Sequence, residues 1–343
     1  MSNDYLKWLS GSTVSNWWHD SADLITMDEA IANGATGVTT NPLLVKRSLY
    51  GFPDFWRPLL SDIPASWTGA QKAEEIIRHI TVEIAKKFEP IYHATKGEQG
   101  YVCAQVNPVF AGDCDIMLTM ARRLHDWAPN IAVKLPVTAA GLDALEECIS
   151  EGITVTATAS FTVPQALSAG KRHMAGLARA KQKGIEGGRC FAVIMVGRLD
   201  DYLRDVAHDQ RSAVPESDII QAGTAAIKRA YRIFGEEGYH AVLMPAGMRG
   251  AYHTTALAGA PMSMSIAPNI QKMLRETPQP WSEHIEEDVP KDVIDRLMTL
   301  SEFVRAYEPE GMKPTDFITY GASQKTLSQF VEAGWHPIEE FKI

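Results

Sequence analysis

Short apolar segments alternate with amphipathic helical segments along most of this chain. Eight segments have the pattern of buried strands, at residues 15–20, 37–41, 101–106, 131–136, 153–160, 190–196, 241–246 and 262–266. Helical patterns lie between them, at residues 22–33, 71–87, 113–127, 140–151, 164–178, 217–234 and 251–257. Strands that alternate with helices form parallel sheets, and eight such repeats favour a closed barrel. The sequence therefore predicts an α/β protein with a (β/α)8 TIM barrel.

A doubly wound open sheet is the alternative for the same alternation. Such sheets commonly carry a Gly-x-Gly-x-x-Gly motif after the first strand or a phosphate-binding Gly-x-x-x-x-Gly-Lys-[Ser/Thr] loop. Neither motif occurs at these places in the sequence. The barrel is therefore the favoured fold.

Two regions do not fit one repeat each. Residues 49–69 are rich in proline and tryptophan, which predicts an insertion that packs on the barrel and carries no chemistry. The last strand is followed by Thr277-Pro278-Gln279-Pro280, a typical boundary. We therefore expect a barrel over residues 1–276 and an appended helical segment over residues 277–343.

The appended segment has helical patterns at residues 291–306 and 324–332. It could close over the barrel mouth, pack on the outside of the barrel, or contact another copy of the chain. The last two are favoured. Tyr320, Lys325 and Trp335 could reach the mouth, but surface packing is the favoured interpretation for them.

Composition excludes several classes of protein. The chain has 33 basic and 42 acidic residues, a net charge of −9, and no basic cluster of the kind that binds nucleic-acid phosphates. No uncharged apolar run reaches the roughly 18 residues of a membrane helix, and the N-terminus lacks the pattern of a signal peptide. We therefore expect neither a nucleic-acid partner nor a membrane span.

The cysteines and histidines indicate neither disulfides nor a metal centre. Cys103, Cys114, Cys148 and Cys190 lie far apart, and two of them fall in predicted strands, which favours buried thiols and a cytoplasmic location. The ten histidines show no His-x-x-x-His or His-Glu-x-x-His spacing. We therefore expect no metal and no cofactor.

One lysine stands in an unusual place, within the apolar run Ile131-Ala132-Val133-Lys134-Leu135-Pro136. Burial disfavours the ammonium form of a lysine, and a neutral amine can attack a ketone to form a Schiff base. A lysine in such a run can also pair with a buried carboxylate or reach solvent at the end of the strand. This segment alone leaves the alternatives open.

Polar residues gather at the predicted carboxyl ends of the strands, where barrel enzymes place their active sites. These are Asp20, Asn41, Gln105, Asn107, Lys134, Thr158, Ser160, Arg198 and Arg249. A lysine, a carboxylate, carboxamides and two arginines at equivalent positions together describe a site for an anionic carbonyl compound. Single residues also have structural interpretations, because Asp20 could cap a helix, Asn41 could mark a turn before a proline, and Arg198 could pair with Asp200 or Asp201.

The residue types suggest a division of labour. Lys134 would attack a ketone, Asp20 would move protons next to the bond that breaks, and Thr158 would position a water. Asn41 and Gln105 would hold substrate hydroxyls and the carbinolamine. Arg198 and Arg249 would bind a phosphate or another terminal anion.

Five segments resemble one known family, the transaldolases with the related fructose 6-phosphate aldolases. They are residues 19–23 (HDSAD), 34–42 (GATGVTTNP), 133–141 (VKLPVTAAG), 152–159 (GITVTATA) and 196–200 (VGRLD). The resemblance extends over about residues 18–270, and the order of the motifs agrees with that family.

This resemblance implies a class I aldolase. Lys134 would be the Schiff-base lysine, Asp20 the general acid and base, and Thr158 the holder of the catalytic water, while Asn41 would stabilise the intermediate. Arg198 and Arg249 match basic residues on the phosphate side. The implied substrate is a ketose phosphate or an analogous anionic ketose, from which a dihydroxyacetone unit passes to an aldehyde, as in carbohydrate metabolism.

Alternative functions remain open. One is aldol cleavage without transfer, and another is a non-catalytic family member that binds a sugar phosphate. Whatever its function, the chain could form a homo-oligomer. Gln105 stands where transaldolases have a glutamate and the fructose 6-phosphate aldolases a glutamine, which favours cleavage. Met195 stands where the family has an aromatic residue, so the tyrosine associated with the aldolase branch is missing, which counts against cleavage. Gly247 replaces a phosphate-binding serine and Val193 a small or hydroxylated residue, so the terminal anion need not be an ordinary phosphate.

Overall fold

Eight parallel strands form the centre of the protein. The computed structural model describes residues 4–64 and 66–343; residues 1–3 of the predicted barrel and residue 65 of the predicted insertion lie outside the described residues. The strands are β1 (Asn16–Asp20), β2 (Ala35–Thr39), β3 (Tyr101–Gln105), β4 (Ile131–Pro136), β5 (Val155–Thr158), β6 (Cys190–Ile194), β7 (Val242–Pro245) and β8 (Ser263–Ile266). Their order is β7-β6-β5-β4-β3-β2-β1-β8. β7 and β8 also lie against each other, so the sheet is a nearly closed barrel and the predicted TIM fold is confirmed.

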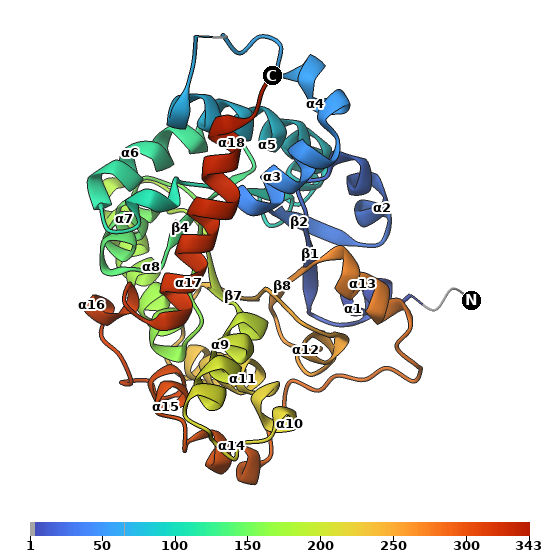
Figure 1. Cartoon of the computed structure of the whole chain (residues 1–343), viewed down its shortest axis with the longest axis vertical. Helices are drawn as coiled ribbons and strands as arrows, with labels where there is room; N and C mark the ends of the chain where they lie inside the picture. The colour runs from blue at the N-terminus through green and yellow to red at the C-terminus, as the bar shows by residue number, and fades with distance from the viewer. Residues whose placement is uncertain (1–3, 65) are drawn as a thin grey trace.

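Helices surround this barrel (Figure 1). Those between consecutive strands include α2 (Met27–Ala32), α5 (Gly69–Ala94), α6 (Cys114–His125), α7 (Ala139–Ser150), α8 (Val163–Lys183), α9 (Val196–Asp209), α11 (Ala222–Glu236) and α12 (Ala251–Thr255). Others are α1 (Tyr5–Ser12), α3 (Pro42–Gly51), α4 (Pro53–Leu59), α10 (Glu216–Ile219) and α13 (Pro268–Arg275), with single turns η1 (Leu24–Thr26) and η2 (Pro108–Phe110). Side chains of Asp113, Thr138 and Thr162 cap α6, α7 and α8, which explains why these helices begin where they do.

The first half of the proline-rich region is helical. α3 and α4 cover residues 49–51 and 53–59 of the predicted insertion at residues 49–69, and Leu49, Trp56 and Leu60 are buried there. The four cysteines are free thiols, and three of them are buried. Within the described parts of the chain, no helix combines the length and apolar composition needed to cross a lipid bilayer.

Three strand predictions extend two residues past the observed ends. The strands predicted at residues 37–41 and 153–160 stop at Thr39 and Thr158. The strand predicted at residues 190–196 stops at Ile194, and helix α9 begins at Val196. The carbonyl of Met195 accepts hydrogen bonds from the backbone N–H groups of Arg198 and Leu199, at 3.0 and 3.1 Å. The chain therefore turns directly from β6 into a helix, and Arg198 lies in its first turn.

The C-terminal segment crosses the mouth of the barrel. It contains α14 (Lys291–Leu297), α15 (Ser301–Tyr307), α16 (Pro314–Phe317), α17 (Gly321–Phe330), the π-helical turn η3 (Val331–Trp335) and α18 (His336–Glu340). Figure 1 shows α17 and α18, in red, running in front of the barrel from the side of α16 toward α4. α17 packs against α9 and α3, and η3 packs against α3.

Candidate active site

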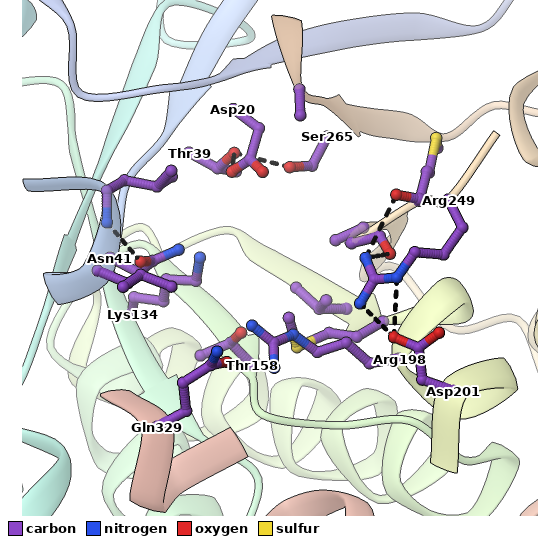
Figure 2. A pocket seen from close by; sticks show the side chains of 18 of the residues that line it. Asp20, Thr39, Asn41, Lys134, Thr158, Arg198, Asp201, Arg249, Ser265 and Gln329 are labelled. Atoms are coloured by element: carbon purple, nitrogen blue, oxygen red, sulfur yellow. Dashed lines mark hydrogen bonds and ion pairs between the residues drawn. The ribbon is translucent and has the colours of Figure 1, made fainter. Parts of the chain in front are cut away.

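A cavity of about 930 Å³ lies at the carboxyl ends of the strands, between the barrel and α17. Six of the residues predicted to form the site line it, as Figure 2 shows. They are Asp20, Asn41, Lys134, Thr158, Arg198 and Arg249. The barrel thus brings to one space residues that are far apart in sequence.

Lys134 projects from β4 into this cavity. Its register partners are Gln105 on β3 and Thr156 on β5. The side chain is only 6% exposed, and Nζ donates a hydrogen bond of 3.1 Å to the carbonyl oxygen of Thr40. No carboxylate of residues 4–64 or 66–343 forms an ion pair with Lys134, so the carboxylate-paired alternative is wrong.

Asp20 ends β1 and is held by a chain of two hydroxyl groups. Its Oδ1 accepts a hydrogen bond of 2.7 Å from Thr39 Oγ1, which lies 2.7 Å from Ser265 Oγ. Because the Thr39 proton points to the carboxylate, Ser265 must donate to Thr39. Asp20 does not cap a helix; that role falls to Asp23, which accepts from the N–H of Ile25.

Asn41 both caps a helix and lines the cavity. Its Oδ1 accepts a hydrogen bond of 3.0 Å from the N–H of Leu44 and caps α3. Its amide nitrogen points toward the space into which the Lys134 amine projects (Figure 2). Thr158, at the end of β5, lines the same cavity and is almost fully buried.

The two arginines differ in their partners. Arg249 is bound to Asp201, with 2.8 Å from Nε and 2.6 Å from Nη2 to the same carboxylate oxygen. Arg198 forms no ion pair with any described carboxylate, so the structural alternative in which it pairs with Asp200 or Asp201 is wrong. It donates a hydrogen bond of 3.4 Å to Thr326 on α17, and its guanidinium lies 5.5 Å from the centre of the Phe330 ring.

Burial, followed by the nearby charge of Arg249, lowers the pKa of Arg198 to about 10. A partly buried cation without a carboxylate partner is stabilised by an anion that enters the cavity. Arg198 is therefore the stronger candidate of the two for binding a terminal anion.

Three of the predicted site residues do not line the cavity. Gln105 is buried next to Lys134 in the sheet, and its Oε1 has no hydrogen-bond partner among the described atoms. Asn107 accepts from the N–H of Val109 and lines a separate groove between α5 and α6. Ser160 donates to the carbonyl of Val193 and is fully buried. Hydrogen bonds with backbone groups thus occupy the side chains of Asn107 and Ser160.

Sequence reasoning also missed residues that line the cavity. Arg47 on α3 lines the cavity together with Leu43 and Leu44, which precede it by four and three residues and so lie on the same helix face. Others are on α17 and η3, namely Lys325, Ser328, Gln329, Glu332 and Ala333. Lys325 therefore reaches the mouth, whereas Tyr320 and Trp335 are buried in packing contacts.

Comparison with known proteins agrees with this arrangement. The chain matches the family described as Transaldolase/Fructose-6-phosphate aldolase over residues 17–329. It belongs to that family. The match reaches further than residues 18–270, because it includes almost all of α17.

Individual transaldolases are similar over part of their length. Transaldolase 1 of Streptomyces avermitilis is 33% identical over 238 residues, which are 66% of this chain and 61% of that protein. Transaldolase 2 of the same organism is 30% identical over 263 residues, 70% of this chain and 65% of that protein. The matched part thus spans less than two thirds of either transaldolase. A putative phosphonomutase from Burkholderia cenocepacia is a more distant structural neighbour, with a TM-score of 0.31 and 14% identity over 89% of this chain and 99% of that chain.

This member of the transaldolase family has no group of three or more His, Cys, Asp or Glu side chains arranged to hold a metal ion, as far as the described residues extend. The polar groups around the cavity are those of two lysines, carboxylates, amides, hydroxyls and arginines. This set can bind a polar anionic molecule and exchange protons with it.

Proposed function

We propose that this protein is a Schiff-base transaldolase that acts on a ketose phosphate or an analogous anionic ketose. The observation that carries the proposal is Lys134, a buried amine without a carboxylate partner that shares one cavity with Asp20 and Asn41. A lysine amine in a cavity beside a carboxylate and an amide can attack the carbonyl of a bound ketone and form a Schiff base.

In the proposed reaction, the neutral Lys134 amine attacks the C2 carbonyl of the ketose; the carbinolamine hydroxyl then takes up a proton from solvent and leaves as water, which gives an iminium ion. Asp20 takes the proton of the C4 hydroxyl, the C3–C4 bond breaks, and its electron pair moves to the iminium carbon to form an enamine. The aldehyde that contains C4 leaves. The enamine then attacks an acceptor aldehyde, Asp20 returns the proton, and hydrolysis frees Lys134.

The other cavity residues would support these steps. Asn41 would donate its amide hydrogen to the intermediate, Thr158 would hold the water that is lost and regained, and Arg198 would bind the terminal anion, with Arg249 beside it. The scheme needs no metal and no cofactor. Gln105 would act next to Lys134 through a rearrangement or a bridging water, because its Oε1 is buried without a partner.

Aldol cleavage without transfer is the second candidate, and Gln105 is the observation that favours it. A glutamine beside Lys134 cannot exchange protons as a glutamate can, which would change how the enamine is consumed. Assays with and without an aldehyde acceptor separate the two. Transfer predicts that product forms only when acceptor is present, whereas cleavage predicts free dihydroxyacetone in its absence.

Borohydride trapping tests the covalent step. Incubation with labelled fructose 6-phosphate and borohydride should attach the sugar to the peptide that contains Lys134, and Lys134→Met should abolish the label. Lys228 is a matched control, since it is also 6% exposed and donates to the carbonyls of His284 and Glu287. The Lys228→Met variant should keep the label on Lys134.

A wild-type protein that binds the sugar but gives no adduct would support the non-catalytic alternative. Activity that requires an added divalent metal would contradict the lysine mechanism.

A further inference from the structure

Four polar residues form a stripe on the C-terminal helix that faces the cavity. Lys325, Ser328, Gln329 and Glu332 follow one another at helical spacing, and all four line the cavity wall. The stripe lies opposite the ends of the strands that carry Lys134 and Thr158. A molecule in the cavity therefore has α17 on one side and the barrel on the other.

Three of these side chains are already engaged. Lys325 forms an ion pair of 2.6 Å with Asp205, and Ser328 donates a hydrogen bond of 3.3 Å to Glu332. The carboxamide of Gln329 forms no hydrogen bond with the described protein atoms. Figure 2 shows its side chain pointing from α17 into the cavity.

The neighbours of Gln329 place it beside the anion site. Thr326, three residues before Gln329, and Phe330, the residue directly after it, both contact the guanidinium of Arg198. Gln329 thus lies near the Arg198 cation, on the side that faces the cavity. A ketose phosphate joined to Lys134 and bound at Arg198 would carry its C5 hydroxyl between these two points.

We propose that Gln329 is a specificity-determining residue that binds the substrate hydroxyl between the cleaved bond and the terminal anion. This inference rests on the proposed function. A carboxamide suits the binding of a hydroxyl because it offers both a hydrogen-bond donor and an acceptor without charge. By contrast, the Lys325 ammonium can only donate and the Glu332 carboxylate can only accept, and both already bind other side chains. The proposal names a polyhydroxylated anionic ketose as the substrate class.

The position of α17 is set by contacts with two elements of the site. A Cβ atom on Gly334 would lie 2.8 Å from the backbone nitrogen of Leu43 and 2.9 Å from Pro42, so η3 meets the start of α3 backbone to backbone. The other contact is the one between Thr326 and Arg198 on α9. Because these two contacts fix the chain on either side of Gln329, its side chain lies at a defined position in the cavity wall.

The test compares fructose 6-phosphate with its 5-deoxy analogue, with an aldehyde acceptor present. The ratio of kcat/KM for the two substrates should fall about tenfold in Gln329→Leu, because a hydrogen bond to the hydroxyl is lost. The Gln329→Asn variant should recover part of the ratio. Gln324→Leu is the matched control, since Gln324 is on the same helix but bonds to the carbonyl of Ile318 and does not line the cavity.

Borohydride trapping on Lys134 separates the possible failures. If the wild type forms the adduct and the ratio is unchanged in Gln329→Leu, the inference about Gln329 is wrong while the proposed function stands. If the wild type forms no adduct with fructose 6-phosphate, the proposed function fails and this inference fails with it.

Discussion

His19, the residue before Asp20, makes the stability of the barrel depend on pH in a predictable way. The ring is 2% exposed, and both of its nitrogens are bound, Nε2 to Thr26 Oγ1 and Nδ1 to Gln271 Nε2, each at 2.8 Å. Gln271 Nε2 can only donate, so Nδ1 must accept, and the ring proton is on Nε2. A second proton on Nδ1 would make it a donor that faces the donor Nε2 of Gln271, with no acceptor between them.

The sign of the effect follows from the direction of the shift. Burial lowers the pKa of His19 from 6.5 to about 4. The unfolded chain therefore binds a proton over a pH range in which the folded protein does not. The stability that neutral His19 contributes is fully present above pH 6.5 and is lost as the pH falls toward 4, at about 1.4 kcal/mol per pH unit and about 3 kcal/mol in all.

Urea unfolding at pH 7 and pH 4.5 measures this loss. In His19→Gln, a neutral side chain that can both donate and accept, the decrease in the free energy of unfolding should be smaller than in the wild type by about 2 to 3 kcal/mol. His208→Gln is the control, because the side chain of His208 is 89% exposed. Equal pH dependence of the wild type and His19→Gln would refute the reasoning.

Two further predictions concern the site. Thr39→Val removes the hydroxyl that donates to Asp20, so we expect kcat/KM to fall about 10- to 100-fold and its pH profile to change shape. Thr39→Ser, which keeps a hydroxyl, should recover both. An unaltered pH profile in Thr39→Val would contradict a role for this hydroxyl. Gly334→Ala forces η3 away from Pro42, which should destabilise the protein by about 1 to 3 kcal/mol and raise KM. Gly235→Ala, at a position with open space around it, should change neither stability nor KM. Thermal melting measures stability and initial rates measure KM, and equal behaviour of the two variants would disprove the close contact.

The strands and most of the flanking helices were predictable from local patterns. Runs of β-branched and apolar residues mark buried parallel strands, and periods near 3.6 mark the helices that cover them. Helix α9 was missed because its start, with Gly197 and Arg198 directly after a strand, has the composition of a loop. The hydrogen bonds to the Met195 carbonyl make it a helix instead.

The candidate site was predictable where a residue stands at the end of a strand. Asp20, Lys134 and Thr158 are within strands whose carboxyl ends must converge in a barrel, so their proximity follows from the fold class. Asn107 and Ser160 lie two residues past the ends of β3 and β5. There the path of the loop decides where a side chain points.

The sequence by itself determined the eight-stranded barrel, because strand and helix periods are local properties of the chain. It also determined the groups that the strand ends bring to the mouth, among them Asp20, Lys134 and Thr158. Only the tertiary structure decided that α17 covers that mouth, that Arg198 bonds with Thr326, 128 residues away, and that Arg249 is bound to Asp201. The physical reason is that such contacts depend on how separate segments approach one another in space, and no pattern within either segment encodes that approach.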